Sequence, residues 1–523
     1  MPIAFLALDQ GECKNGIRPN QASIRPPIDD TMRMRLSQLA AAHSARGGAT
    51  ALIHDGGTLT YLELCDEVDA LAAAMRADRL AGTPVALMLP NSPALVTSYL
   101  ACFAAGAIAA PLNRRYAAPE VERALRRIRP RWLLVHADRL ELLARVDAST
   151  LADVRLILVG AGPTEGFEAY RDVLDSGRGT AFEPDVAPDE AAVVFLTSGS
   201  TGQPKGVVHS HNSALAMLTS TSEALGDVRA DDVVQVFEPL VHVSGFIATF
   251  TTLLAGGTVV LYDGFDIDTY AHALRTHRPT LICTHIDVLA QLLHVDGVCR
   301  EWFSSLRGVY TGGDTVPARL QQEFMATAGL PIGVGYGMTE AIWLTVQRAP
   351  RTNRDGCIGR PVRGVHLRID DATGEVLVCG PMVMKGYWED DALTASTLID
   401  GWFRTGDLAE QDDDGVWWFT GRIKDVIVRR TSKITPGEVE AALEQHPSVE
   451  LAAVVGAPDA EEGQVPVAFV VPRAGATLAP DELVAFLSDR IAAYKIPVRL
   501  HLRSALPLTP SGKISRRELV ESA

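Results

Sequence analysis

Short apolar runs alternate with amphipathic segments along the first two thirds of the chain. Residues 61–77 carry apolar side chains at helical spacing, and the run VALMLP at 85–90 is typical of a buried strand. The alternation continues through strand-like apolar runs at 131–137, 154–159, 191–196, 232–237, 258–262 and 280–284. Buried strands separated by helices predict an α/β fold with a largely parallel sheet that helices cover on both faces.

The pattern changes twice towards the C-terminus. From about Gly356 the strands become shorter and the turns closer together, which predicts a small β-rich subdomain. After Asp425 a compact α+β region follows, joined by a junction too short to be a long tether. Within it, the run Thr435-Pro436-Gly437-Glu438 has the composition of a capping box with proline at the first helical position.

Two apolar stretches are long enough to cross a bilayer. Residues 91–113 and 239–262 contain no Asp, Glu, Lys or Arg, and a membrane-spanning helix needs about 20 residues. Each stretch divides at glycine into a helix-like first half and a short strand-like tail, and neither has flanking basic clusters or aromatic belts. We therefore interpret each as a buried helix followed by a buried strand, and we expect no membrane span.

Composition and charge narrow the class of protein. Of 523 residues, 47% are hydrophobic and 21% charged, which is a globular composition, and the net charge is −16. An acidic surface repels phosphate backbones, so we expect no nucleic-acid partner. The seven cysteines include no Cys-x-x-Cys pair and the N-terminus has no basic segment before its apolar residues, so we expect reduced thiols, no signal peptide and a cytoplasmic location.

The strongest chemical signal is a loop of alternating hydroxyls and glycines directly after the apolar run at 191–196. It reads TSGSTGQPKG and comprises Thr197, Ser198, Gly199, Ser200, Thr201, Gly202, Gln203, Pro204, Lys205 and Gly206. Backbone N–H groups and hydroxyls in such a loop can converge on phosphate oxygens, and Lys205 supplies positive charge. The spacing differs from that of a Walker loop.

With this loop the chain resembles the adenylate-forming superfamily of acyl-CoA synthetases, adenylation domains of peptide synthetases, and luciferases. The other motifs of that family are also present and in the family's order: PLVHVSG at 239–245, GYGMTE at 335–340, GEVLVCGPMVMKGYWE at 374–389, FRTGD at 403–407, GRIKD at 421–425 and PSGKI at 510–514. The resemblance covers about residues 35–520 and is closest to the acyl-CoA synthetase branch.

The resemblance implies a fold and a division into domains. We expect a large N-terminal domain of stacked α/β sheets with a small β-barrel subdomain, and a mobile α+β C-terminal domain. The expected boundaries are 1–30 for an N-terminal extension, 31–423 for the nucleotide- and acyl-binding domain, and 424–523 for the C-terminal domain. Lys424 is the implied hinge.

The resemblance also implies ATP, Mg²⁺ and CoA as cofactors and a small carboxylic acid as substrate. The carboxylate attacks the α-phosphate of ATP, which gives an acyl-adenylate and pyrophosphate and demands mainly positioning and positive charge. Lys513 is the candidate to bridge the carboxylate and the α-phosphate, and the 197–206 loop is expected to hold the outer phosphates. Glu340 is the implied metal ligand, with Thr339 near the α-phosphate.

The remaining implied residues bind the nucleoside and the acyl group. Tyr336 is suited to pack on adenine, while Asp407 and Arg422 are suited to hold the ribose. His242 is the implied gate of the acyl pocket, because it stands in a Pro-x-x-His segment; alone it would more often be a core histidine. The other expected acyl-pocket residues are Val243, Ser244, His285, Asp287, Gly312, Gly313 and Gly337.

The sequence departs from the family pattern at the expected floor of the acyl pocket. His285 and Asp287 stand where relatives carry an apolar turn, and two explanations remain open. They either meet a polar group on the acyl substrate or form an internal His–Asp pair, so an aromatic, cyclic or functionalised acid is as good a candidate as a plain fatty acid. A separate pair, His209 and His211, has no carboxylate or cysteine partner nearby, so we interpret it as loop and helix-start histidines rather than as a metal site.

A second departure concerns the CoA tunnel, where the family carries two glycines and this chain carries Arg430 and Thr431. Side chains there should narrow the approach of the thiol or alter the turn, because glycine tolerates positive φ better than arginine or threonine. An enzyme that runs only one half-reaction, with a carrier protein or a partner adenylating enzyme, is therefore an alternative to a complete acyl-CoA ligase. A homodimer and a non-catalytic acyl binder also remain open.

Overall fold

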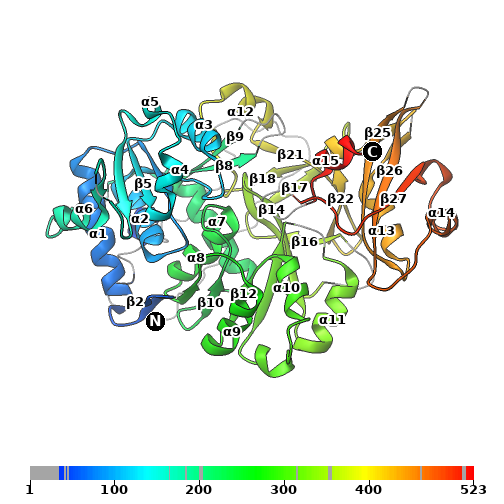
Figure 1. Cartoon of the computed structure of the whole chain (residues 1–523), viewed down its shortest axis with the longest axis horizontal. Helices are drawn as coiled ribbons and strands as arrows, with labels where there is room; N and C mark the ends of the chain where they lie inside the picture. The colour runs from blue at the N-terminus through cyan, green and yellow to red at the C-terminus, as the bar shows by residue number, and fades with distance from the viewer. Residues whose placement is uncertain are drawn as a thin grey trace.

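A computed structural model describes residues 35–39, 43, 46–163, 165–182, 185–198, 204–313, 316–350, 356–430, 432–459, 462–508 and 514–523. Two large sheets form most of the molecule, and a third, smaller sheet lies at the C-terminal end, at the right of Figure 1. The predicted mixed α/β class is confirmed.

The first large sheet has eight strands in the order β19-β9-β8-β4-β3-β5-β6-β7. The strands of this sheet are β3 (Pro84–Met88), β4 (Ile108–Pro111), β5 (Trp132–His136), β6 (Arg155–Val159), β7 (Glu168–Ala169), β8 (Ala191–Ser198), β9 (Pro204–Ser210) and β19 (Gly386–Tyr387). Its central strands are parallel, as the alternating pattern predicts, whereas β9 runs antiparallel to both β8 and β19. The associated helices are α1 (Tyr61–Ala77), α2 (Pro93–Ala105), α3 (Ala118–Ile128), α4 (Leu140–Leu143), α5 (Ala148–Leu151) and α6 (Tyr170–Gly177).

The second large sheet has fourteen strands and begins with a parallel part. The strands of that part and its edge are β1 (Thr50–His54), β2 (Gly57–Thr60), β10 (Val233–Val236), β11 (Thr258–Leu261), β12 (Leu281–Cys283), β13 (Gly308–Gly312) and β14 (Ile332–Met338). The helices between these strands are α7 (His211–Ala224), α8 (Val243–Leu254), α9 (Ile267–His277), α10 (Ile286–Leu292) and α11 (Ala318–Ala328). Helix α7 contacts strands of both large sheets, so it belongs to the layer between them.

The rest of the second sheet is the predicted β-rich segment. Its strands are β15 (Ala341–Gln347), β16 (Cys357–Pro361), β17 (His366–Ile369), β18 (Glu375–Cys379), β20 (Leu398–Ile399), β21 (Trp402–Gln411) and β22 (Trp417–Arg422), with α12 (Asp391–Thr397) beside them. Antiparallel pairing runs from β14 through β15 and β16 to β22, β21, β18 and β17. Among the described strands β17 ends this path without pairing back, so the β-rich segment is an open arm that continues the large sheet.

The C-terminal sheet has the predicted α+β character. Its strands are β23 (Ile427–Arg429), β24 (Ser432–Ile434), β25 (Val449–Asp459), β26 (Gly463–Pro472) and β27 (Arg499–Leu502), and its helices are α13 (Pro436–Glu444), α14 (Pro480–Ser488) and α15 (Arg516–Glu521). Helix α13 starts as expected, with Thr435 at the N-cap and Pro436 in the first turn, but the capping box is wrong because no side-chain cap bond forms. Glu438 instead pairs with Lys495.

Both apolar stretches fold as a buried helix followed by a strand. In the first, Ser92 caps the start of α2 by accepting a hydrogen bond from the Leu95 N–H, and Gly106 ends the helix at φ +73° before β4 begins. The second becomes α8 and β11. Phe103, Phe246 and Phe250 of these helices pack against one another in the core. Within the described chain, no helix combines the length and the apolar character that crossing a membrane requires.

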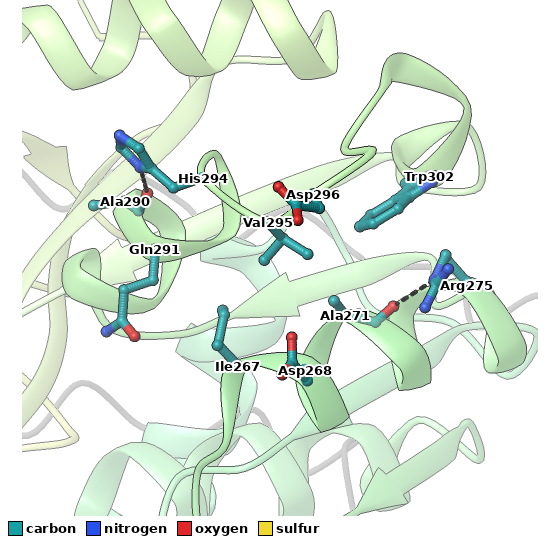
Figure 2. Close-up of a pocket in the computed structure, with 10 residues that line it drawn as sticks. All are labelled: Ile267, Asp268, Ala271, Arg275, Ala290, Gln291, His294, Val295, Asp296 and Trp302. Carbon is teal, nitrogen blue, oxygen red and sulfur yellow. Dashed lines mark hydrogen bonds between the residues drawn. The ribbon is translucent and has the colours of Figure 1, made fainter.

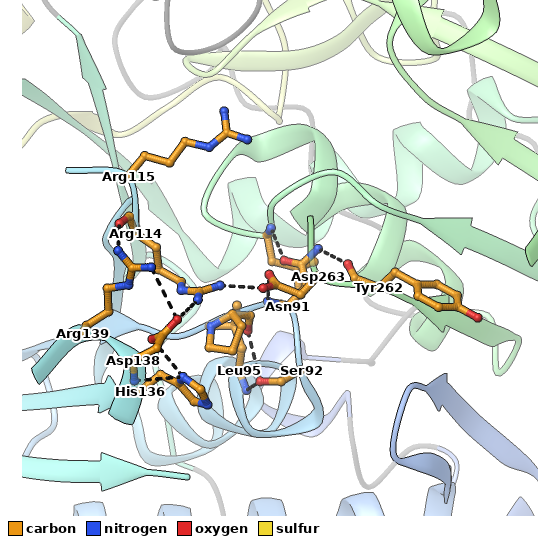
Figure 3. Close-up of polar contacts among 12 residues, drawn as sticks. Asn91, Ser92, Leu95, Arg114, Arg115, His136, Asp138, Arg139, Tyr262 and Asp263 are labelled. Atoms are coloured by element: carbon orange, nitrogen blue, oxygen red, sulfur yellow. Dashed lines mark hydrogen bonds and ion pairs between the residues drawn. The ribbon is translucent and has the colours of Figure 1, made fainter. Parts of the chain in front are cut away.

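A polar network fastens the two large sheets together where their parallel strands end (Figure 3). The Asn91 backbone N–H, after β3, donates to Asp263, after β11, at 2.9 Å. Arg114, after β4, pairs with the same Asp263 at 2.6 Å and also with Asp138 after β5. The Asn91 side chain donates to the Tyr262 carbonyl at 3.0 Å. These bonds place the carboxyl ends of both sheets side by side, which is where α/β folds present their sites.

Candidate active site

The predicted phosphate loop joins two strands of the first sheet. Strands β8 and β9 form a hairpin in which Thr197 lies opposite Lys205. Gly199, Ser200, Thr201 and Gly202 lie outside the described residues, and so do the Ser198 side chain and Lys513. The described part thus brings both ends of the predicted loop together beside Lys205.

Tyr336, Asp407 and Arg422, predicted as nucleoside-binding residues, lie in contact. Asp407 on β21 faces Arg422 on β22 in register, with 3.2 Å between carboxylate Oδ1 and guanidinium Nε. The Tyr336 hydroxyl donates to Asp407 Oδ2 at 2.8 Å. Burial, and then the Asp407 charge, raise the pKa of Tyr336 well above its usual value, so the phenol stays protonated as a donor.

Thr339 and Glu340 form the two-residue turn between β14 and β15, because Met338 pairs with Ala341. Three contacts hold this turn from outside the hairpin. The His209 ring Nε2 lies 2.7 Å from the Thr339 carbonyl, and the Met384 N–H donates to the Glu340 carbonyl at 2.7 Å. The Tyr387 hydroxyl donates to Glu340 Oε1 at 2.9 Å. Backbone and side chain of the turn are therefore both fixed.

Tyr387 also lies against the predicted phosphate-binding lysine. The Lys205 ammonium is 5.5 Å from the centre of the Tyr387 ring, a cation–π distance. Strand β19 brings the tyrosine there by pairing with β9, where Tyr387 faces Val207. Glycine is needed at 206, because a Cβ at that position would lie 2.8 Å from the Trp388 Cβ. Lys205 and Glu340 thus share one aromatic neighbour.

His209 and Tyr387 are the contacts of the turn that sequence reasoning missed. His209 stands beside the phosphate motif but was interpreted as a loop histidine, whereas it is the fully buried last-but-one residue of β9. Burial lowers the pKa of His209 to about 4, so its ring is neutral at pH 7. Tyr387 lies in a sequence motif that suggested no role for it. Their proximity to the turn depends on strand pairing, which the sequence alone did not reveal.

The predicted acyl-pocket residues lie at the ends of neighbouring strands in the second sheet. His242 is the N-cap residue of α8, followed by the buried Val243 and the half-buried Ser244. Gly312 closes β13, where a Cβ would lie 2.9 Å from the Gly335 carbonyl, and Gly313 follows at φ +87°. Gly337 lies in β14. These glycines keep the strand ends free of side chains.

Of the two open explanations for His285 and Asp287, the structure gives no support to an internal pair among the described contacts. Asp287 is exposed in the first turn of α10, where a carboxylate is favoured by the helix dipole. The buried acid of this region is Glu238, at the end of β10 and beside β12, and its charge interacts with that of His285. Burial raises the pKa of Glu238, and its Oε2 has no hydrogen-bond partner. The sequence showed this glutamate directly before Pro239, but nothing marked it as buried.

The hinge and tunnel predictions fall on an exposed part of the C-terminal sheet. Lys424 is exposed in the short turn Ile423–Asp425. Arg430 takes φ +54°, so the tight turn after β23 forms with arginine in the left-handed region. Its N–H donates to the Glu462 carbonyl at 2.7 Å, and its side chain lies 3.8 Å from the Glu462 carboxylate. Thr431 lies outside the described residues.

A cavity of about 730 Å³ opens between α9, α10 and the turn Arg300–Phe303 (Figure 2). Arg275 stacks over the Trp302 ring there, with 4.6 Å between guanidinium and ring centre. The residues lining it are Ile267, Asp268, Ala271, Arg275, Ala290, Gln291, His294, Val295, Asp296 and Trp302. None of the predicted site residues is among them, so this cavity is not the candidate active site.

The described residues suit a magnesium ion held mainly by substrate. No group of three or more His, Cys, Asp or Glu side chains in the described chain could hold a metal ion. Mg²⁺ usually binds through one or two carboxylates together with substrate phosphates. Glu340 fits that pattern, because Tyr387 engages only its Oε1 and the same tyrosine ring lies against Lys205, a residue of the predicted phosphate motif.

Comparison with known proteins matches nearly the whole chain. The AMP-binding enzyme family matches residues 39–388, and the AMP-binding enzyme C-terminal domain matches residues 438–513. An indoleacetate–CoA ligase from Aromatoleum aromaticum is 37% identical over 503 residues, which are 93% of this chain and 98% of that protein. A feruloyl-CoA synthase from Amycolatopsis is 36% identical over 489 residues, 90% and 95% of the two chains. The ATP-bound structure of MatB from Rhodopseudomonas palustris superposes with a TM-score of 0.86 at 26% identity, covering 94% and 99%.

Proposed function

The chain belongs to the AMP-binding enzyme family, and we propose that it is an AMP-forming acid–CoA ligase whose acid carries an aromatic ring. The acid–CoA ligase activity rests on relatives at 36–37% identity that span almost the whole chain. The observation that carries the assignment to this chain is the convergence of Lys205, Glu340 and the Tyr336–Asp407–Arg422 cluster at neighbouring strand ends.

In the adenylation step these residues bind and orient ATP. Asp407 accepts hydrogen bonds from the ribose hydroxyls, held in place by Tyr336 and Arg422. Lys205 and the hydroxyls of the 197–202 loop bind the outer phosphates, and Thr339 lies near the α-phosphate. Mg²⁺, which Glu340 would hold, supplies positive charge for the phosphate oxygens. We assign to Lys513, from its motif, the bridge between the carboxylate and the α-phosphate.

The acyl end of the proposed site favours an acid with a hydrogen-bond donor. A buried carboxyl oxygen without a partner is unfavourable, and a donor on the substrate ring, such as an indole N–H or a phenol, would satisfy Glu238 Oε2. His242, Val243 and Ser244, with Gly312, Gly313, Gly337 and His285, supply the remaining wall. The names of the two relatives, an indoleacetate ligase and a feruloyl synthase, agree with an acid of this kind.

We assign the second half-reaction to the same chain. Arginine at position 430, where the family carries glycine, was the reason to doubt the thioester step. Arg430 nevertheless takes the left-handed conformation that the turn requires. CoA is thus the proposed thiol acceptor, with rotation about Lys424 as the proposed domain movement. A carrier protein is the alternative acceptor. We place the enzyme in the cytoplasm, because the cysteines among the described residues form no disulfide.

A panel of acids tests this function directly. Indoleacetate, ferulate, benzoate and a medium-chain fatty acid are offered with ATP, and pyrophosphate exchange and CoA thioester are measured separately. We expect exchange and thioester formation with a ring-bearing acid, and loss of exchange in Lys513→Ala. Arg517→Ala is the matched control, because it removes the positive charge of an exposed α15 side chain close to Lys513 in the sequence. No exchange with any acid would contradict the proposal, and thioester formation only on a carrier protein would change the acceptor.

A further inference from the structure

His209 and Tyr387, neither of which had a predicted role, both bond to the Thr339–Glu340 turn, His209 from β9 and Tyr387 from the neighbouring strand β19. We propose that they are positioning residues, which orient the turn so that Glu340 can hold Mg²⁺ against the phosphates bound by Lys205. The proposal rests on the proposed function, because that function gives the turn its role.

The turn needs such support because it stands at the end of a hairpin. Its own hairpin fixes it only through the Met338–Ala341 pair at its base. Strand β9 reaches the turn backbone through His209, and strand β19 reaches the Glu340 side chain through Tyr387. Because β9 pairs with β19, both contacts come from one rigid ribbon, which also carries Lys205. The distance between Lys205 and Glu340 is therefore set by that ribbon.

The chemistry of His209 fixes the direction of its bond. A carbonyl oxygen can only accept, so the His209 Nε2 carries the hydrogen that the Thr339 carbonyl accepts at 2.7 Å. The Nδ1 atom then accepts from the Ser213 hydroxyl at 3.3 Å. Ser213 lies in the first turn of α7, so the helix start orients the ring. A neutral, buried ring with both nitrogens engaged is a fixed donor at neutral pH.

Tyr387 acts on the carboxylate rather than on the backbone. Its hydroxyl donates to Oε1 of Glu340, and this bond fixes the orientation of the carboxylate plane. Tyr387 is 8% exposed and its backbone N–H donates to the Thr394 hydroxyl at 2.9 Å, so the tyrosine is itself fixed. A phenylalanine would retain the ring beneath Lys205 and lose only the bond to Glu340.

The first test compares Tyr387→Phe with Tyr61→Phe. Tyr61 donates from its buried hydroxyl to the Gly257 carbonyl at 2.7 Å, so this control loses a similar bond away from the site. Calorimetry measures ATP affinity with and without Mg²⁺. We expect the factor by which Mg²⁺ increases ATP affinity to fall about tenfold in Tyr387→Phe and to stay unchanged in Tyr61→Phe. The rate of adenylate formation should fall similarly, while thioester formation from a supplied acyl-adenylate stays unchanged.

The second test separates the two contacts of the turn. His209→Gln keeps an amide donor and should retain Mg²⁺-dependent ATP affinity, whereas His209→Leu should lose it by about tenfold. Equal loss of both half-reactions, or an unchanged gain from Mg²⁺ in Tyr387→Phe and His209→Leu, would overturn the proposal. Failure of the parent protein to activate any acid would instead refute the proposed function, and the calorimetric comparison would still decide the positioning role.

Discussion

The nucleotide side and the acyl side of the proposed site differ in how their buried polar groups are satisfied. On the nucleotide side, Asp407 binds Tyr336 and Arg422, and Glu340 binds Tyr387. On the acyl side, Glu238, Thr284 and Tyr270 are buried close to one another, and Glu238 Oε2 accepts no hydrogen bond from a protein group. Polar groups of one kind thus stand in two different states in the same sheet, with β13 and β12 between β14, which carries Tyr336, and β10, which Glu238 follows.

In the proposed function, this difference divides recognition between the nucleotide and the acid. In the proposed function the nucleotide is ATP for every acid, and groups already bonded to one another bind it without reorganisation. The acid is what varies, and a buried polar group without a partner favours a ligand that supplies one. We therefore expect substitutions on the nucleotide side to weaken ATP binding for every acid, and those on the acyl side to alter the choice of acid.

Asp407→Asn should break the nucleotide side most severely. It removes the charge that Arg422 and the proposed ribose contact share, so we expect ATP affinity to fall about hundredfold, or ~3 kcal/mol, with every acid. Isothermal titration with ATP measures this loss. Asp413→Asn, an exposed carboxylate in the adjacent turn, is the control and should leave affinity unchanged. A loss seen with one acid only would contradict the division between the two sides.

Acid should loosen the phosphate-loop strand before the rest of the molecule. Burial lowers the pKa of His209 and of His211 to about 4, against the usual 6.5. The unfolded chain therefore binds more protons than the folded chain between pH 6.5 and 4, and the free energy of unfolding should fall by up to ~3 kcal/mol per histidine across that window. Stability should be independent of these groups above pH 7.

Chemical denaturation at several pH values measures that slope. His209→Gln should reduce it by about half, because Gln does not titrate and His211 remains. An unchanged slope in this variant would show that other groups control acid unfolding.

Glu238→Gln should alter the choice of acid more than the rate. Its raised pKa shows that the folded state disfavours the charged form, so stability contributed by this group decreases as pH rises above 4.5. The neutral amide should therefore raise the Tm at pH 8. We expect the ratio of kcat/KM between a ring acid with a donor and benzoate to change about tenfold, with ATP affinity unchanged.

Asp287→Asn is the matched control on the acyl side. This carboxylate is exposed, so its substitution should alter neither the ratio nor the Tm. If Asp287→Asn changed the choice of acid and Glu238→Gln did not, the assignment of Glu238 to the acyl wall would be wrong.

The sequence predicted the positions of helices and strands better than it predicted which strands pair and which side chains are in contact. Apolar runs located the buried strands and the helix–strand pairs at 91–113 and 239–262, because a fully buried element consists mainly of apolar residues. The strand order of the β-rich segment did not follow from the pattern, because alternation shows that a strand has two faces but not which strand it pairs with; β16 pairs with β15. Asp287 was misjudged because a spacing of two residues at a helix start does not fix which side faces solvent. Glu238 and His209 escaped notice because burial of a lone polar residue is decided by distant strands.

The smallest expected effect comes from replacing Arg430 by glycine, which tests whether this arginine only strains the backbone or also narrows the proposed CoA tunnel. Arg430 holds φ +54° after β23, and Arg278 holds φ +46° at the end of α9, both conformations that favour glycine. Replacing either by glycine relieves the left-handed strain and loses only exposed side-chain contacts, so each variant should gain up to ~1 kcal/mol of stability. Only Arg430→Gly should also lower KM for CoA, by about threefold, because Arg278 lies on a helix of the other sheet, away from the proposed tunnel. Equal stabilisation with no change in KM for CoA would show that the arginine turn strains the fold without narrowing the tunnel.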